Sequence, residues 1–246
     1  MTAVALVPVR DALVLAAGNG DRFHNGTRQS KLLQPLAGQP LILRTLETAR
    51  TAGITCVELV LGYQADAVRA VIEHAAPRDV LIHFSINAEW HLENGVSVLA
   101  ARNQLDGRRF ALLMGDHLFE AATLARLLQM PAEPDETLLG VDVRATSPSI
   151  AAEATKVRMT GSRITAIGKE LTTYDALDTG LFVCAPSVFN ALEVSRASGD
   201  TTLSGGIREL ATRGLVRGVD IGNSSWHDID TMADLEAAAD LLTEHA

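Results

Sequence analysis

The chain has 246 residues, of which 47% are hydrophobic and 21% charged, a balance typical of a folded globular domain and not of a disordered chain. Its formal net charge of -9 disfavours unspecific binding to nucleic acids or anionic membranes, so any phosphate ligand must be held by local cationic groups. Arg10 and Asp11 interrupt the apolar N-terminal stretch, and we therefore expect no signal peptide, no membrane span and a cytoplasmic location. At this length we expect a single domain over residues 1–246.

The first half of the chain alternates between strand-like and helix-like segments. Residues 12–17 are continuously apolar and stop at Gly18, as expected of a strand buried on both faces. Apolar side chains recur at helical spacing over residues 41–52, and residues 57–61 resemble the next strand, which completes a βαβ unit. The same alternation predicts helices at 65–75, 95–103 and 121–130 and strands at 80–86 and 110–114. It indicates a parallel sheet with helices on both sides.

After Pro131 the predicted strands become shorter and are separated by turn signals. They are expected at 136–143, 155–159, 164–168 and 176–184. We interpret residues 136–184 as a small β-rich insertion that covers the site and selects the substrate. Helices at 186–197, 207–212 and 232–244 and a strand at 215–221 complete the chain. The predicted fold class is α/β, a Rossmann-like mixed but mainly parallel sheet flanked by helices.

A glycine-bearing turn follows the first strand, at the sheet edge where open α/β folds bind their ligands. Gly18 and Gly20 allow backbone N–H groups to approach phosphate oxygens, and Arg22 and Lys31 would add positive charge. A dinucleotide loop of the pattern GxGxxG is incomplete here, since Phe23 stands at the third glycine, and the Walker A pattern is absent. The plainer alternative is that the two glycines only turn the chain. The nucleotide-binding candidates in this loop are Leu15, Ala16, Ala17, Gly18, Asn19 and Gly20.

Three carboxylates are candidates for holding a divalent cation. Asp116 follows a buried strand, so it should emerge at the same edge as the glycine loop, and carboxylate oxygens suit Mg²⁺. Asp228 and Asp230 precede the last helix and would share one face of a strand. A helix cap is the competing interpretation, above all for Asp230. His117 and His227 could also be metal ligands, but neither belongs to a recognisable histidine cluster, so we expect second-shell or solvent-facing roles for them.

Two motifs together resemble the nucleotidyltransferase superfamily that includes sugar-phosphate and alcohol-phosphate nucleotidylyltransferases. The family pattern is LAAGxGxR followed by PKxLxxxxGxPL, and it corresponds here to residues 15–22 and 30–41, with Ser30 in place of the usual proline. The resemblance implies a nucleotide-diphospho-sugar transferase-like fold and roles for Arg22 and Lys31 at the triphosphate. It also implies that Asp116 and Asp228 bind Mg²⁺, with Asp230 as the competing candidate that the sequence does not exclude.

Other segments are similar to CTP:inositol-1-phosphate cytidylyltransferases. They are residues 91–101, 114–117, 153–171, 174–183, 203–204 and Trp226. This resemblance implies a magnesium-dependent transfer of CMP from CTP to a small phosphorylated alcohol, with release of pyrophosphate. Members of that group are often fused to a membrane-embedded phosphotransferase that consumes the CDP-alcohol, and here we expect any such partner to be a separate polypeptide. The sequence leaves open whether the chain forms a homo-oligomer.

Further side chains are candidates for holding the two substrates. Lys169 would bring its ammonium group to the acceptor's phosphate, although a solvated surface lysine is the commoner case. Lys156 is a weaker candidate for that task, and Asp178 and Thr179 would bind acceptor hydroxyls or simply form a strand edge. The candidates for contacts with the nucleotide base are Asn87, Asn94, Gly95 and Ser97.

The main alternative activity is a cytidylyltransferase for a phosphonate such as 2-hydroxyethylphosphonate, or for another sugar or alcohol phosphate. Phosphocholine fits less well, because a quaternary ammonium needs aromatic side chains and these make up only 4% of the chain. An inactive nucleotide-binding regulatory module and an NAD-dependent oxidoreductase are more remote alternatives.

Overall fold

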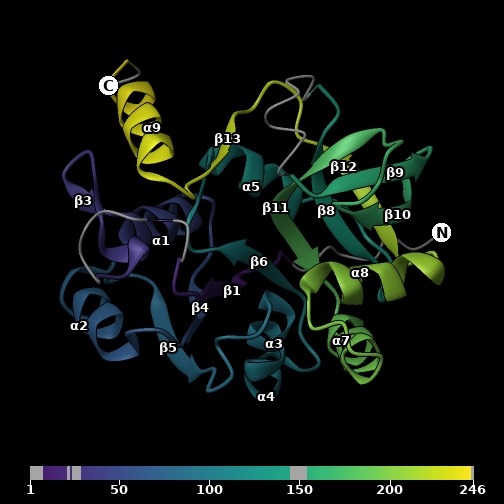
Figure 1. Cartoon of the computed structure of the whole chain (residues 1–246), viewed down its shortest axis with the longest axis horizontal. Helices are drawn as coiled ribbons and strands as arrows, with labels where there is room; N and C mark the ends of the chain where they lie inside the picture. The colour runs from purple at the N-terminus through teal and green to yellow at the C-terminus, as the bar shows by residue number, and fades with distance from the viewer. Residues whose placement is uncertain (1–7, 21–22, 24–28, 145–153, 245–246) are drawn as a thin grey trace.

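A computed structural model of the protein describes residues 8–20, 23, 29–144 and 154–244 (Figure 1). Its centre is a nine-stranded sheet with the strand order β5-β4-β1-β6-β11-β8-β12-β10-β9. In that order the strands are Leu81–Ile86, Cys56–Leu61, Asp11–Ala16, Phe110–Met114, Ala176–Cys184, Thr137–Asp142, Val216–Asp220, Arg163–Gly168 and Lys156–Thr160. Two short pairs stand outside this sheet: β2 (Pro35–Leu36) with β3 (Gln39–Pro40), and β7 (His117–Phe119) with β13 (Trp226–Asp228).

The two halves of the sheet differ in strand direction. Strands β5, β4, β1 and β6 are mutually parallel, as the βαβ pattern of the first half of the sequence predicts. Strand β11 then runs antiparallel to both of its neighbours β6 and β8, whereas β8 and β12 are again parallel. The predicted α/β class with a mixed sheet is therefore confirmed.

Residues 136–184, which we expected to form a β-rich insertion covering the site, are arranged differently. Strands β8 and β11 run through the middle of the main sheet, and only β9 and β10 form a hairpin, at its end. The physical reason is burial. Every residue of β8 is buried and so are eight of the nine residues of β11, so neither strand could lie on the surface of an insertion.

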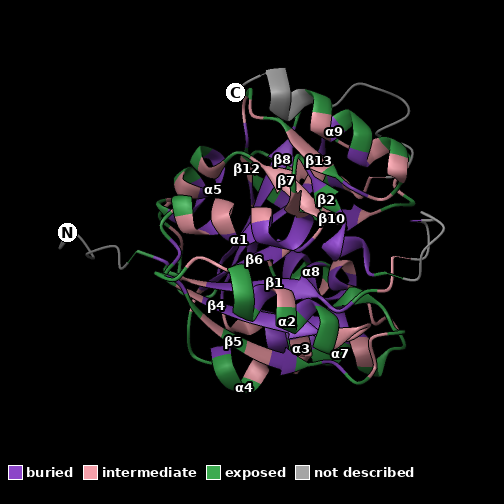
Figure 2. Cartoon of the chain, turned by 90° about the vertical axis from the view of Figure 1, so that its left-hand side faces the viewer, coloured by how far each residue is buried: buried purple, intermediate pink, exposed green. Residues whose placement is uncertain are grey.

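Helices cover both faces of the sheet, and Figure 2 shows buried strands between helices whose outer sides are exposed. Along β1, Leu13 and Leu15 point into one core while Ala12 and Val14 point into the other, which is the period of two expected of a strand. The first core is covered by α3 (Asn94–Ala100), α4 (Arg102–Leu105), α7 (Ser187–Ala197) and α8 (Leu203–Thr212). The second is covered by α1 (Leu41–Thr51), α2 (Ala65–Ala75) and α5 (Ala121–Leu128).

The last helix, α9 (Met232–Glu244), rests on a third, smaller core. Phe23, at the end of the glycine loop, is 7% exposed and belongs to this core together with Leu235 of α9 and Ile229. The loop that begins at Gly18 is thus anchored by an apolar contact to the C-terminal helix. No helix among the described residues is both long and apolar enough to cross a membrane.

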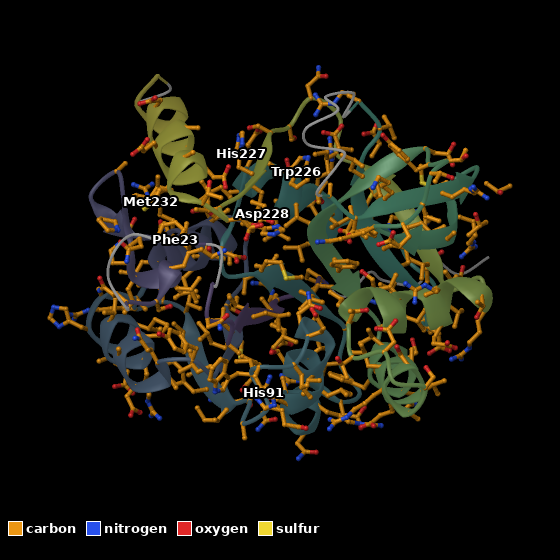
Figure 3. All side chains as sticks on the ribbon, in the orientation of Figure 1. Phe23, His91, Trp226, His227, Asp228 and Met232 are labelled. Carbon is orange, nitrogen blue, oxygen red and sulfur yellow. The ribbon has the colours of Figure 1, made fainter. Side chains whose placement is uncertain are left out.

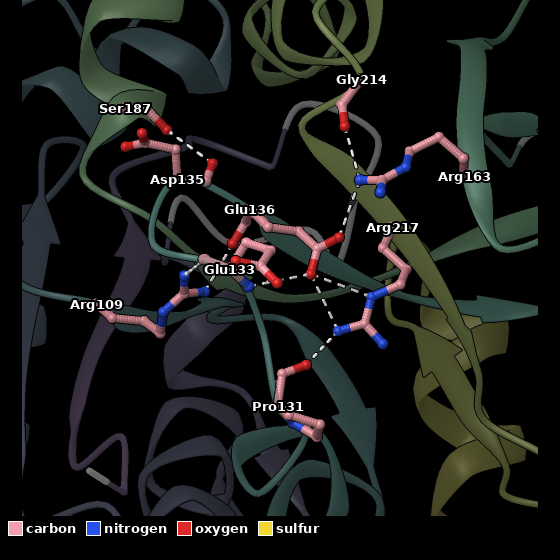
Figure 4. Close-up of polar contacts among 9 residues, drawn as sticks. All are labelled: Arg109, Pro131, Glu133, Asp135, Glu136, Arg163, Ser187, Gly214 and Arg217. Atoms are coloured by element: carbon pink, nitrogen blue, oxygen red, sulfur yellow. Dashed lines mark hydrogen bonds and ion pairs between the residues drawn. The ribbon is translucent and has the colours of Figure 1, made fainter. Parts of the chain in front are cut away.

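A buried carboxylate fastens the start of β8 to its neighbours (Figure 4). The side chain of Glu136 is 5% exposed, and it accepts hydrogen bonds from Arg163 of β10 at 2.9 Å and from Arg217 of β12 at 3.1 Å. Arg109 donates to the carbonyl oxygen of Glu136 at 2.7 Å. Because a buried charge is stable only when it is paired, this network should hold the β9–β10 hairpin against the main sheet.

We expect Glu136→Ala to lower the free energy of unfolding by about 3 kcal/mol, since it leaves two guanidinium groups without their shared carboxylate. Urea denaturation followed by circular dichroism measures this change. Asp135→Ala is the matched control, because it removes an exposed carboxylate one residue away. Equal effects of the two substitutions would contradict the structural role of Glu136.

Candidate functional site

A cavity of about 770 Å³ opens at the carboxyl end of β1 and β6. The glycine loop and the end of β6 form its floor, α3 and the segment before it form one wall, and β11, β13 and the β10 end form the other. The residues predicted from sequence that line it are Leu15, Ala16, Ala17, Gly18, Asn19, Gly20, Lys31, Asn94, Ser97, Asp116, Lys169, Asp178, Asp228 and Asp230. Ligand binding at the carboxyl ends of parallel strands is the rule for open α/β sheets.

The glycine loop leaves room where a ligand would need it. A Cβ atom added at Gly18 would meet no other atom within 4 Å, so the backbone there is open to the cavity. Gly20 has a φ of +63°, and a Cβ there would lie 3.2 Å from the Cβ of Lys31. The turn is closed by a hydrogen bond from Phe23 N–H to the Gly20 carbonyl at 2.8 Å. Arg22, predicted beside the triphosphate, lies outside the described residues.

Lys31 is held in the short 3-10 helix η1 (Lys31–Leu33) by its neighbour Ser30. The Ser30 hydroxyl accepts a hydrogen bond from Leu32 N–H at 3.4 Å and thereby caps the helix. The backbone N–H of Ser30 donates to Gln64 Oε1 at 2.8 Å, a bond that the family's proline cannot make. The departure from the family pattern is thus compensated by two hydrogen bonds that fix the lysine.

The ammonium of Lys31 lies between two carboxylates. Its side chain is 7% exposed, and Nζ is 2.8 Å from Asp116 Oδ2 and 3.1 Å from Asp230 Oδ1. Burial alone would lower the pKa of Lys31, but Asp116, followed by Asp230 and Asp228, raises it above its ordinary value. Lys31 is therefore a fixed positive charge at the floor of the cavity, and Lys31 and Asp116 open onto the same surface.

Asp116, His117 and Asp228 form a compact group of possible metal ligands. Each offers one ligand atom, and these atoms lie within 4.8 Å of one another. His117 Nε2 is 3.5 Å from Asp228 Oδ1, and its Nδ1 is 3.2 Å from the Thr179 carbonyl. Burial opposes the charged imidazole, yet the carboxylate of Asp228 raises the pKa of His117 to about 9. In turn His117 and Lys31 outweigh the effect of burial and lower the pKa of Asp228.

Asp230 has a different position from Asp228. It accepts the hydrogen bond from Lys31, and among the described residues it is not part of the group that could share an ion. The segment that precedes α9 contains a second set of hydrogen bonds. Asp234 Oδ2 accepts from the Asp230 and Thr231 N–H groups, and Thr231 Oγ1 accepts from Asp234 N–H, which together form a capping box.

The wall formed by α3 divides the base-binding candidates into two layers. Asn94 and Ser97 line the cavity, whereas Asn87 is 3% exposed and donates from Nδ2 to Ser97 Oγ at 2.9 Å. A Cβ at Gly95 would lie 2.6 Å from the Thr201 carbonyl, so this glycine lets α3 pack against the loop before α8. Asn87 and Gly95 do not line the cavity and support its wall from behind, so their contact with the nucleotide stays a prediction.

The candidates for binding the acceptor fall into two groups, those that line the cavity and those that do not. Lys169 and Asp178 line the cavity, whereas Thr179 is 1% exposed and its hydroxyl donates to the Gly140 carbonyl at 2.8 Å. Side chains alternate along β11, so Asp178 and Gly180 face the cavity and Thr179 faces away, contrary to the prediction for Thr179. Lys156 does not line the cavity either, because its Nζ donates to the Lys169 carbonyl at 2.7 Å. Burial raises the pKa of Asp178 to about 6.

Sequence reasoning missed several side chains of the cavity, among them Trp90 and His91. Trp226 was noticed only through family resemblance, although it stands two residues before Asp228 and so shares its strand face. Its indole Nε1 donates to Asp142 Oδ2 at 3.2 Å. Figure 3 shows Trp226 and Asp228 on β13 and His91 far from them, near α3.

Comparison with known proteins agrees with this geometry. Residues 12–163 match the family described as the MobA-like NTP transferase domain, which is more than half of the chain. The chain belongs to this family. The resemblance to nucleotidyltransferases inferred from the glycine loop and Lys31 is thereby confirmed, and the chain is a MobA-like nucleotidyltransferase domain.

Two relatives of this MobA-like domain illustrate its similarity to proteins of known activity. A bifunctional IPC transferase and DIPP synthase of Rubrobacter xylanophilus is 33% identical over 235 residues, which cover 94% of this chain and 51% of the relative. A CMP-5'-(3-aminopropyl)phosphonate synthase of Streptomyces rubellomurinus is 38% identical over 155 residues, 58% of this chain and 24% of that protein. The chain thus spans about half the length of the bifunctional relative.

Solved structures of other nucleotidyltransferases share the fold. The inositol-1-phosphate CTP transferase from T. maritima superposes with a TM-score of 0.84 at 26% identity, covering 97% of this chain and 96% of that one. A UDP-glucose pyrophosphorylase in complex with UDP-glucose gives a TM-score of 0.78 at 16% identity, covering 97% of this chain and 100% of that one, which supports the fold alone.

We expect Gly180→Ala to destabilise the site strongly. Gly180 has a φ of +76°, and a Cβ there would lie 2.6 Å from His117 Cε1. Gly161→Ala is the matched control, since its φ is +60° but its Cβ would meet nothing within 4 Å. In urea denaturation Gly161→Ala should cost about 1–2 kcal/mol for the left-handed backbone, and Gly180→Ala about 1–3 kcal/mol more for the clash. Similar losses of unfolding free energy in Gly180→Ala and Gly161→Ala would show that the contact with Gly180 does not fix the imidazole of His117.

Proposed function

We propose that the chain is a magnesium-dependent cytidylyltransferase that transfers CMP from CTP to a small phosphorylated alcohol of the inositol-1-phosphate kind. The observation that carries the proposal is the contact of Lys31 with Asp116 at 2.8 Å, next to the glycine loop. It brings one fixed positive charge and one metal-binding carboxylate to the same side of the glycine loop, whose backbone is accessible from the cavity. This combination suits a triphosphate, whose oxygens bind both amides and cations.

The divalent ion would be held by Asp116 and Asp228. The donor set fits such an ion, because carboxylate oxygens from two separate segments approach one another at the cavity floor. When bound, the ion would neutralise negative charge on the triphosphate and on the departing pyrophosphate. Asp230 would instead keep Lys31 in place.

The chemistry needs no general base. An oxygen of the acceptor's phosphate is already anionic and attacks the α-phosphorus of CTP, forming a new P–O bond while the bond from the α-phosphorus to the bridging oxygen breaks. Pyrophosphate leaves with that electron pair. Lys31 and the glycine-loop amides would bind the triphosphate, and Lys169 would position the attacking phosphate. Catalysis then rests on placement and charge neutralisation.

The acceptor side of the cavity supports a polyol phosphate. Lys169 supplies a cation for the phosphate, and Asp178 supplies a carboxyl group for hydroxyls, while Trp226 adds an apolar wall. The inositol-1-phosphate CTP transferase of T. maritima, similar over nearly its whole length, supports CTP and inositol 1-phosphate as substrates. The CDP-alcohol formed would be consumed by a phosphotransferase, as the second activity named for the bifunctional relative suggests.

A phosphonate acceptor is the second candidate. It is favoured by the relative named as a CMP-5'-(3-aminopropyl)phosphonate synthase. A phosphonate presents the same anionic oxygens to Lys169 but has no ring of hydroxyls for Asp178. The two candidates therefore share the nucleotide side of the site and differ only on the acceptor side.

We expect pyrophosphate release only from CTP among the four common NTPs, and with inositol 1-phosphate rather than 3-aminopropylphosphonate or phosphocholine. A coupled pyrophosphate assay over this panel, in the presence of Mg²⁺, measures it. Asp116→Asn keeps the side-chain shape but removes the charge, and should lower the rate by about 100–1,000-fold. Release with another NTP or acceptor would reassign the substrate, and full activity of Asp116→Asn would exclude its role.

Lys169→Ala should raise the KM for the acceptor at least about tenfold and leave the KM for CTP unchanged, because a hydrogen bond to a charged group is worth about 1.5–3 kcal/mol. Initial-rate kinetics with each substrate varied in turn separates the two effects. Arg158→Ala removes a positive charge from an exposed side chain of β9 that does not line the cavity, and it is the matched control. An unchanged acceptor KM in Lys169→Ala would exclude the proposed role.

A further inference from the structure

We propose that His117 is a third protein ligand of the divalent ion, through Nε2, and that the site therefore binds Mn²⁺ more tightly than Mg²⁺. This inference rests on the metal site of the proposed function. It adds a nitrogen donor to the two carboxylates and concerns the ion that the site selects. The sequence offered His117 as a metal ligand but favoured a second-shell or solvent-facing role for it.

The position of His117 is set by the short sheet that carries the second carboxylate. Strands β7 and β13 are antiparallel, and His117 is the direct partner of Asp228 in their register. Residues paired in this way have neighbouring Cβ atoms, so their side chains reach the same point. His117 Nε2 lies 3.5 Å from Asp228 Oδ1, and both belong with Asp116 to the group whose ligand atoms are within 4.8 Å.

The second ring nitrogen of His117, Nδ1, is already engaged by a backbone carbonyl, so Nε2 is the nitrogen that can bind an ion. His117 Nδ1 lies 3.2 Å from the Thr179 carbonyl, which can only accept a hydrogen bond, so Nδ1 carries the proton. Metal-bound histidines usually donate their second N–H to a carbonyl or carboxylate in this way, which fixes both the tautomer and the ring orientation. An ion bound at Nε2 would displace the proton that the ring holds toward Asp228, while Nδ1 keeps its own.

A glycine makes space for this orientation. Gly180 faces the cavity next to the Thr179 carbonyl, and its φ of +76° is a conformation that other residues rarely adopt. A Cβ at Gly180 would lie 2.6 Å from His117 Cε1, so only glycine allows the imidazole to occupy its place. The side chain of His117 is 15% exposed, which limits it to a few orientations. The ring is thus fixed from behind by a carbonyl and a glycine.

A site with one imidazole and two carboxylates differs chemically from an all-oxygen site. Mg²⁺ prefers oxygen ligands in regular octahedral geometry, whereas Mn²⁺ and the later first-row ions accept imidazole nitrogen as well. The additional nitrogen donor should therefore favour Mn²⁺ over Mg²⁺. The phosphate oxygens of a bound nucleotide would complete either coordination sphere.

The test uses Mn²⁺ as a paramagnetic probe on the full chain, treated first with EDTA and then freed of it. Electron spin echo envelope modulation of the Mn²⁺-loaded protein should show modulation from a directly bound ¹⁴N, and labelling the histidines with ¹⁵N should replace it with the ¹⁵N pattern. Titration followed by EPR should give tighter binding for Mn²⁺ than the value obtained for Mg²⁺ by competition. No nucleotide or acceptor is needed for these measurements.

His117→Gln should remove the nitrogen modulation and weaken Mn²⁺ binding at least about tenfold, with a smaller effect on Mg²⁺. His227→Gln is the matched control, because His227 is adjacent to Asp228 but does not line the cavity. It should retain both the modulation and the affinity.

The absence of nitrogen modulation in the wild-type protein would overturn the inference, and so would Mn²⁺ binding no tighter than that of Mg²⁺. These outcomes do not require the His117→Gln protein to fold. They also leave the proposed function untouched, since pyrophosphate release in the substrate panel can still occur with an all-oxygen site. Conversely, a Mn²⁺ site with nitrogen modulation but no activity in the panel would refute the proposed function alone.

Discussion

A lysine ammonium group that is almost fully removed from water must have carboxylates beside it, because an isolated buried charge costs far more than a folded domain can tolerate. Lys31 meets this requirement with Asp116 and Asp230, which come from segments about 85 and 199 residues further along the chain. The ion pairs therefore fix three separate parts of the fold at one point: the helix η1, the end of β6 and the segment before α9. The remaining features of the cavity are arranged around that point.

The mixed strand directions of the sheet explain why the two sides of the cavity differ. Parallel strands β1 and β6 end at the same edge and deliver the glycine loop and Asp116 side by side. Strand β11 runs the opposite way, so it crosses this edge in mid-strand and presents Asp178 and Gly180 from its middle. One side of the cavity is consequently built from loops at strand ends, and the other from the middle of a strand.

Local pattern was sufficient to predict the parallel half of the fold and the floor of the site. The apolar run before Gly18 and the helical spacing that follows it are short-range signals, and Lys31 and Asp116 could be placed from them because parallel strands share an edge. The antiparallel insertion of β11 between β6 and β8 depends on pairings between distant segments, which no local pattern records. Which of Asp178 and Thr179 faces the cavity depends on a single step in strand alternation, and the sequence left both a binding role and a strand-edge role open for Thr179.

The same limit applies to the group around Asp228. Only the pairing of β7 with β13 brings His117 opposite Asp228, and both strands are three residues long, too short for a period to be recognised in the sequence. The choice between Asp228 and Asp230 likewise depends on which of them Lys31 contacts. Family resemblance supplied the candidates here, and our preference for Asp228 as the metal ligand is a proposal based on its position beside Asp116 and His117.

The apolar contact between Phe23 and α9 joins the glycine loop to a helix far along the chain. Domains emerge from the ribosome N-terminus first, so β1 and the glycine loop are synthesised more than two hundred residues before the helix that anchors them. During translation the parallel strands can assemble while the glycine loop still lacks its apolar anchor. The contact that holds this loop therefore forms only after α9 has been synthesised.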